Sequence, residues 1–126
     1  MMNINIVSIQ QFGHLPQSFS TLKFFFKFFY DSEIFASASG DNTCKIWNVN
    51  EISSIQTIKA HQYEILTCDW NKYNENILVT GSVDKTIKIW DIRNTKQATT
   101  TMKGHTYAVR RLKCSPHDEN IIASCS

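Results

Sequence analysis

Apolar and polar residues alternate over short stretches of this chain, and clusters of turn-forming residues separate those stretches. Around residues 64–70 the alternation centres on Ile65, Leu66 and Cys68, which is the period of a half-buried strand. Ile87 and Ile89 occupy alternate positions farther on, which also favours an extended chain. These patterns predict four strands, at 64–70, 77–81, 86–91 and 97–102. The polar stretches between them are predicted to be turns, at 71–76, 83–85 and 93–96.

This four-strand pattern recurs along the chain. The stretch 78–93, LVTGSVDKTIKIWDIR, restates 35–50, FASASGDNTCKIWNVN, at a spacing of 43 residues. The stretch 61–82 matches 105–126 in the same way, at a spacing of 44 residues. A period of about 40 to 45 residues that carries a histidine, short strands and a Trp-Asp pair is typical of WD-repeat β-propellers. We therefore predict an all-β fold, a WD-repeat β-propeller fragment of about two and a half four-stranded blades.

The regular pattern begins near residue 34, so we expect two parts. Residues 1–33 are predicted to be a degenerate N-terminal segment that contributes to the first blade, and residues 34–126 to be the propeller fragment. The stretch 22–30, LKFFFKFFY, holds six aromatic residues in nine positions, and its two lysines make it too charged to span a bilayer. We interpret it as a degenerate inner strand, with Ser18 where the repeat has histidine. A membrane- or partner-binding patch, or a segment that is not genuinely translated, are the alternatives.

Composition and charge reduce the number of possible functions. The chain has 126 residues, 42% of them hydrophobic, and can form a core, but closed propellers have about four to eight blades. We therefore expect a fragment of a larger ring with exposed blade faces. The net charge of +2 is too small to favour a nucleic-acid partner. No apolar run is long enough to span a membrane, and residues 1–17 lack a secretory signal, which favours the cytosol.

Cysteine and glycine positions argue against metal and phosphate sites. The chain has four cysteines, Cys44, Cys68, Cys114 and Cys125. Because they are separated by 24, 46 and 11 residues, which is no zinc-site spacing, we expect small buried apolar side chains, no metal and no cofactor. It also has four glycines, Gly13, Gly40, Gly81 and Gly104. These are expected at turns, and their wide separation excludes a phosphate-binding loop.

The most specific polar pattern is the set His61, Thr80, Asp84 and Trp90, spaced 19, 4 and 6 residues apart. An indole only donates hydrogen bonds, a hydroxyl and an imidazole donate and accept, and a carboxylate accepts. We therefore predict a structural relay in the order indole, hydroxyl, imidazole, carboxylate, which joins the strands of one blade. Parts of the same set recur at the same spacing, at Ser37, Asp41, Trp47, His105 and Ser124.

A hydroxyl, a histidine and an aspartate are also the members of a hydrolase triad. A nucleophile, however, must face a cleft and be free to attack, whereas here an indole would occupy the hydroxyl. The spacing also recurs from blade to blade, which favours a structural role. We therefore predict that the chain has no catalytic residues and is not an enzyme.

Two longer segments carry a more specific resemblance. AHQYEILTCDWNKYNENILVTGSVD, followed by IWDIRN and GHTYAVRRLKCSP, resembles the middle blades of the receptors for the type-2 peroxisomal targeting signal, the seventh-peroxin family. FASASGDNTCKIW fits the preceding blade, so the resemblance covers about residues 34–126. The chain departs from the pattern in its N-terminal part, at Asn48 in place of the WD aspartate, and at Ala60 where glycine precedes the histidine.

This resemblance implies a cytosolic receptor that shuttles to the peroxisome and delivers cargo to its matrix. Receptors of this family bind an N-terminal amphipathic helical signal with basic residues and a His-Leu pair, together with an import co-receptor, and use neither nucleic acid nor membrane insertion. Carried over position by position, the peptide-binding top face comprises Gly40, Glu64, Leu66, Val83, Ala108 and Arg110. We expect Glu64 to meet a basic residue of the signal, with a merely solvated carboxylate as the alternative.

Two other interpretations stay open. DWNKYNENILVTGSVDKTIKIWDIRN also resembles histone-binding and other chromatin WD-repeat scaffolds, although HTYAVRRLKCSP favours the peroxisomal receptors. The chain could instead be a truncated product that is inactive by itself. If the chain is made alone, we expect it to aggregate or to form a swapped multimer through its open blade ends.

Overall fold

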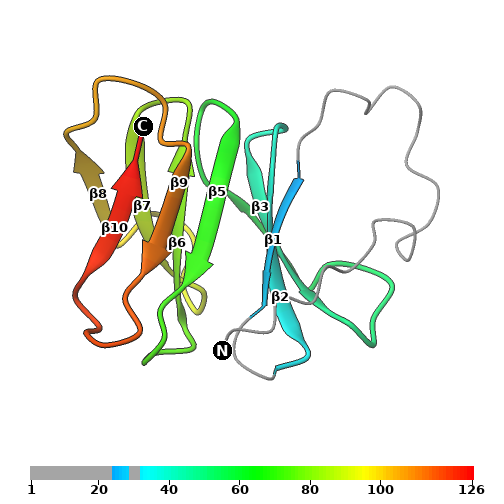
Figure 1. Ribbon diagram of the computed structural model, residues 1–126. Coiled ribbons are helices and arrows are strands. Elements are labelled where there is room, and N and C mark those ends of the chain that lie inside the picture. The colour runs from blue at the N-terminus through cyan, green and yellow to red at the C-terminus, as the bar shows by residue number, and fades with distance from the viewer. Residues whose placement is uncertain (1–23, 29–31) are drawn as a thin grey trace.

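The structure is a computed structural model that describes the backbone of residues 24–28 and 32–126 and the side chains of 32–126. Within these ranges the chain forms antiparallel strands and no helix (Figure 1). The strands are β1 (Phe24–Phe28), β2 (Ile34–Ser39), β3 (Thr43–Asn48), β4 (Gln56–Lys59), β5 (Ile65–Trp70), β6 (Ile77–Ser82), β7 (Thr86–Asp91), β8 (Thr100–Lys103), β9 (Arg111–Cys114) and β10 (Ile122–Cys125). The sheet orders β1-β2-β3-β4, β5-β6-β7-β8 and β10-β9 confirm the predicted propeller fragment of two and a half blades.

Blade 1 is the sheet β1–β4, in which each strand pairs with the next along the chain. Strand β1 pairs with β2 from Phe24 opposite Ser39 to Phe28 opposite Phe35. The centre of the aromatic stretch 22–30 therefore forms the first strand of the blade, as predicted. The ends of that stretch and Ser18 lie outside the described residues.

Blade 2 is the sheet β5–β8. Its first three strands, β5, β6 and β7, agree with the predicted strands to within one residue at either end. The fourth strand begins at Thr100, so the prediction that it starts at 97 was wrong. The chain turns at 91–94, where the Asn94 N–H donates to the Asp91 carbonyl at 3.0 Å, and residues 95–99 after this turn are irregular. Pairing with β7 resumes only where the Thr99 N–H donates to the Ile89 carbonyl at 2.8 Å.

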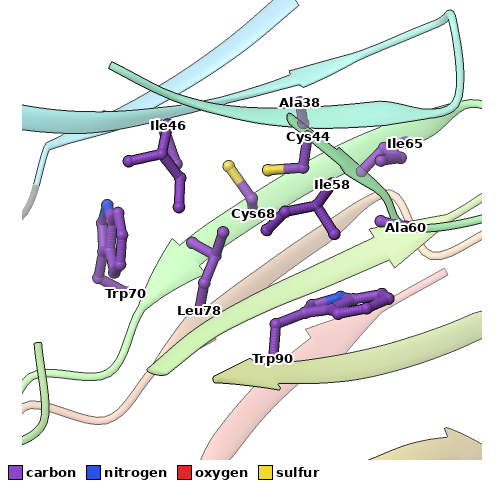
Figure 2. Close-up of a cluster of buried hydrophobic side chains, with 11 residues drawn as sticks. Ala38, Cys44, Ile46, Ile58, Ala60, Ile65, Cys68, Trp70, Leu78 and Trp90 are labelled. Carbon is purple, nitrogen blue, oxygen red and sulfur yellow. The ribbon is translucent and has the colours of Figure 1, made fainter. Parts of the chain in front are cut away.

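Blades 1 and 2 pack face to face through an apolar cluster. Figure 2 shows side chains from β3 and β4 of blade 1 pointing toward side chains from β5, β6 and β7 of blade 2. The buried members are Ala36, Ala38, Cys44, Ile46, Ile58, Ala60, Ile65, Cys68, Trp70, Leu78 and Trp90. Several are small, which lets the two sheets approach closely while the two tryptophans fill the remaining width. The blades therefore share one core.

Blade 3 consists only of β9 and β10, and it packs on the opposite face of blade 2. A second apolar cluster lies between them. Its buried members are Val79, Ile87, Val109, Leu112 and Cys114. This cluster is smaller than the first, and polar contacts supplement it.

Two polar side chains of β5 bind the backbone of β9. The Thr67 hydroxyl accepts a hydrogen bond from the Leu112 N–H at 3.3 Å, and an oxygen of Asp69 accepts one from the Cys114 N–H at 2.9 Å. The other Asp69 oxygen accepts from Lys72 Nζ at 2.8 Å, although the Asp69 side chain is only 1% exposed. A buried charge is tolerated when it is paired and hydrogen-bonded, and both conditions hold here. We call this set of contacts the β5–β9 clasp.

Two predictions from residue type were wrong. Gly81 lies inside β6 and not at a turn. The position requires glycine because the surrounding side chains leave no room for a Cβ atom. A Cβ atom at this position would lie 2.8 Å from Val109 Cγ1 and 2.9 Å from Thr67 Cγ2. Cys125 is exposed, unlike the three buried cysteines, because β10 is the outermost strand of a two-stranded sheet.

We expect Gly81→Ala to lower the free energy of unfolding by about 1 to 3 kcal/mol, because the added methyl group overpacks the contact between blades 2 and 3. Urea denaturation followed by tryptophan fluorescence measures the change. Gly104→Ala is the matched control, since a Cβ atom there meets nothing within 4 Å. Equal stability of the two variants would contradict the close packing of the two blades.

Candidate functional site

Turns and loops at one end of the blades are joined by hydrogen bonds. The Val83 N–H donates to the Glu64 carbonyl at 3.0 Å, and Asn42 Nδ2 donates to the Gln62 carbonyl at 3.1 Å. A backbone N–H of the loop before β9 donates to the Ser82 carbonyl at 3.0 Å. We call this end, which is uppermost in Figure 1, the upper face. It comprises the turns 40–42 and 83–85 and the loops 60–64 and 104–110.

The four residues of the predicted relay lie within hydrogen-bonding distance of one another in blade 2. The indole Nε1 of Trp90 donates to Thr80 Oγ1 at 3.0 Å, and Thr80 Oγ1 lies 2.8 Å from His61 Nε2. His61 Nδ1 lies 2.7 Å from an oxygen of Asp84, whose other oxygen accepts from the Thr86 N–H at 2.9 Å. The set links β7, β6, the loop 60–64 and the turn 83–85. It thereby fixes the upper face of blade 2 on its sheet.

The two ionisable groups of this relay respond differently to their surroundings. Burial lowers the pKa of His61 below its usual 6.5, and the hydrogen bond to Asp84 offsets this only in part. Partial burial alone would raise the pKa of Asp84, but hydrogen bonds from Thr86 and His61 together hold it below the usual 3.8. At neutral pH a neutral imidazole therefore donates to a carboxylate, and its Nε2 accepts from the Thr80 hydroxyl.

Blades 1 and 3 contain parts of the same relay. In blade 1, Trp47 Nε1 donates to Ser37 Oγ at 2.9 Å, while the Asp41 carboxylate accepts from the Thr43 hydroxyl at 2.6 Å. In blade 3, His105 Nε2 lies 2.8 Å from Ser124 Oγ, and this pair is exposed. Only blade 2 has all four members within the described residues. The complete relay joins its upper face to its sheet.

The buried relay is poorly suited to chemistry on a substrate. The Thr80 hydroxyl is fully buried and already bonded to an indole and an imidazole, so it has no free path to an incoming carbonyl group. In the described part of the chain no group of three His, Cys, Asp or Glu residues is arranged to hold a metal ion. A search of the same residues finds no helix able to cross a membrane. A partner that binds the upper face would therefore contact its exposed loops.

The residues predicted to bind a peptide all lie at or beside the upper face. Glu64 and Arg110 are exposed, and the other four are half-buried, namely Gly40, Leu66, Val83 and Ala108. Leu66 is the additional residue of a bulge in β5, because the pairing with β6 shifts between Ile65 and Thr67. A bulge changes the direction of a side chain, so Leu66 departs from the regular alternation of β5.

Two exposed tyrosines on the upper face were missed by the sequence analysis. Tyr63 is 58% exposed and Tyr107 is 74% exposed. Each stands two residues after the histidine of its repeat, so the 44-residue spacing was a usable signal. Tyrosine combines a large apolar surface with a hydrogen-bonding group, which suits binding to other proteins.

We expect Thr80→Ala to lower the free energy of unfolding by about 2 kcal/mol, because it leaves a buried indole and imidazole without their common partner. Thr80→Ser is the matched variant, since it keeps the hydroxyl and should recover most of the stability. Chemical denaturation of the three proteins provides the measurement. A serine variant as unstable as the alanine variant would show that the methyl group matters and the hydroxyl does not.

We expect the stability of the chain to decrease as the pH falls below 6.5. The unfolded state then takes up a proton on His61 while the folded state, whose His61 pKa is lowered, does not. The loss is at most about 1.4 kcal/mol per pH unit for this one proton. The depressed pKa of Asp84 adds its own loss only below pH 3.8. Thermal unfolding between pH 7.5 and 5 should show this dependence, and His61→Gln should reduce it.

Comparison with known proteins agrees with this architecture. The family described as WD domain, G-beta repeat matches residues 7–48, 52–91 and 96–126. The peroxisomal targeting signal 2 receptor of Dictyostelium discoideum is 64% identical over 35 residues, 28% of this chain and 11% of that protein. The receptor of the same name from Saccharomyces cerevisiae is 31% identical over 119 residues, 77% of this chain and 32% of that protein. The guanine nucleotide-binding protein subunit beta of Oryza sativa is 33% identical over 85 residues, 64% of this chain and 22% of that protein.

The chain spans a third or less of the length of these relatives. They differ in name but share the repeat, whose common use is as a scaffold that binds other proteins. The family match covers most of the sequence, and the described strands form the corresponding blades. This chain therefore belongs to the WD-repeat family.

Proposed function

We propose that this chain is part of a receptor that binds type-2 peroxisomal targeting signals in the cytosol and shuttles with its cargo to the peroxisome. The observation that carries the proposal is the similarity to relatives named as peroxisomal targeting signal 2 receptors, one of which aligns with 77% of the chain. The upper face of residues 34–126 is the binding surface. An import co-receptor is the expected second partner.

Glu64 is the residue we assign to recognition of a basic side chain in the signal. Its backbone is held by two hydrogen bonds, because its carbonyl accepts from the Val83 N–H at 3.0 Å and from the Ser82 hydroxyl at 2.8 Å. Its side chain is exposed. A fixed backbone that carries an exposed carboxylate limits the entropy lost when a basic peptide binds.

Leu66 and Val83 supply the apolar part of this surface. Both are half-buried. Leu66 lies near the Glu64 backbone because it is in the bulge of β5, and Val83 does because its N–H donates to the Glu64 carbonyl. An amphipathic helix needs apolar contacts for affinity and charges that set its register. The surface around Glu64 has both, and we assign the exposed Arg110 of the next blade to contact with an acidic group.

We also propose that the chain is not an enzyme. The hydroxyl, imidazole and carboxylate that resemble a hydrolase triad are bonded to one another and to an indole inside blade 2. Their role is to hold the upper face in place. Binding of a peptide is the activity that this arrangement supports.

We expect the 126-residue chain to bind a fluorescein-labelled type-2 signal peptide, and Glu64→Arg to weaken that binding at least about tenfold, or 1.4 kcal/mol. The charge reversal replaces an attraction to the basic residues of the signal with a repulsion. Fluorescence anisotropy titration gives the two dissociation constants. Glu75→Arg is the control, because this exposed carboxylate lies in the loop 71–76 at the opposite end of blade 2.

A histone-tail peptide and a scrambled signal peptide complete the experiment. Binding to the histone tail alone would favour a chromatin scaffold and overturn the receptor proposal. A folded chain that binds neither peptide would also overturn it for this fragment. Equal weakening by both arginine substitutions would show that net charge, and not the upper face, governs binding.

A further inference from the structure

The loop between β3 and β4, residues 49–55, exposes three aliphatic side chains. Val49 is 46% exposed, Ile55 is 52% exposed, and Ile52 is fully exposed at 101%. Figure 1 shows this loop projecting from blade 1 at the end opposite the upper face. We call it the aliphatic loop. Exposed branched aliphatic residues grouped on one short loop are uncommon unless the loop contacts another molecule.

The repeat itself does not require an aliphatic residue at 52 or 55. In the equivalent loop of blade 2, Thr95 lies 43 residues after Ile52. Thr99 corresponds to Ile55, because the N–H groups of Thr99 and Ile55 donate to the equivalent carbonyls of Ile89 and Ile46. Only the position of Val49 is aliphatic in both blades, and Ile92 there is half-buried. Within the described residues, several exposed aliphatic side chains gather in one loop only in blade 1.

The aliphatic loop is held in one conformation by hydrogen bonds at both ends. The Val49 N–H donates to the Glu33 carbonyl at 2.9 Å, and Asn50 Nδ2 donates to the Glu33 carboxylate at 2.7 Å. At the other end, the Ile55 N–H donates to the Ile46 carbonyl at 2.8 Å. A loop fixed in this way loses little conformational entropy when a partner covers it.

The charges beside the loop are mainly acidic. Glu33 and Glu51 are exposed, and no lysine or arginine occurs between residues 46 and 58. On the adjacent loop of blade 2, the Arg93 guanidinium is paired with Asp91 at 2.7 Å, and Lys96 is exposed. An acidic border around aliphatic side chains is complementary to a ligand that combines aliphatic and basic residues.

We propose that the aliphatic loop is a second protein-binding surface, which binds a partner segment rich in aliphatic and basic residues. Ile52 is the central contact, since it has the most surface to bury, and Val49 and Ile55 flank it. Glu33 and Glu51 meet the basic residues of the partner. This surface lies at the end opposite the proposed signal site, so the chain can hold two ligands at once.

The test is a selection from a displayed library of random dodecapeptides against the 126-residue chain, with the Ile52→Asp variant used to remove peptides that bind elsewhere. We expect the remaining peptides to be enriched in aliphatic residues together with lysine and arginine. A selected peptide should bind the unchanged chain at least tenfold more tightly than the variant. Ile121→Asp, the same change at an exposed isoleucine of blade 3, should leave its affinity unchanged.

Several results would overturn the proposal. Selected peptides that are acidic, or that bind Ile52→Asp as well as the unchanged chain, would exclude this surface as their site. A self-association seen in sedimentation equilibrium and abolished by Ile52→Asp would assign the loop to a second copy of the chain. Binding to phosphatidylcholine vesicles that is abolished by the same change would assign it to a membrane. Because Ile52 and Ile121 are both exposed, both variants should fold. Unchanged binding of the type-2 signal peptide separates this test from the preceding one.

Discussion

The hydroxyl of Thr80 is the group on which most of this structure depends. It accepts from the indole of Trp90 and lies 2.8 Å from His61, and it is fully buried. Through it, strands β6 and β7 of blade 2 are connected to the loop and the turn that form the upper face. A hydroxyl suits this place because it donates and accepts at the same atom, which neither a methyl group nor a carboxylate can do.

The two faces of β5 explain how neighbouring blades are held together. On one face, Cys68 and Trp70 pack into the apolar core shared with blade 1. On the other face, Thr67 and Asp69 bind backbone N–H groups of β9 in the β5–β9 clasp. Apolar packing contributes most of the cohesion but sets little register, whereas directional hydrogen bonds fix one strand relative to the next. Blade 2 uses each kind of contact on a different side.

Much of the fold and of the relay could be predicted from the sequence, because alternation and a repeated spacing are signals that appear along the chain itself. Asp69 could not be predicted as a buried group. The equivalent residue of the next repeat, 44 positions later, is Lys113, so the aspartate does not recur. Its burial depends on the approach of blade 3. The same approach of blade 3 explains Gly81. A glycine in the sequence suggested a turn, whereas in the structure glycine is needed because neighbouring side chains would collide with a Cβ atom. Glu64 was placed by resemblance, and the exposure of Tyr63 became clear only in the structure.

Blade 3 shows that contacts between neighbouring blades can be concentrated on one strand. In β9, the N–H groups of Leu112 and Cys114 are bonded to buried side chains of blade 2. In β10, three of the four residues are exposed, and the Ser124 hydroxyl meets His105 at the surface. The contacts of blade 3 with blade 2 therefore run mainly through β9. Two strands of a single sheet are anchored to the neighbouring blade to different degrees.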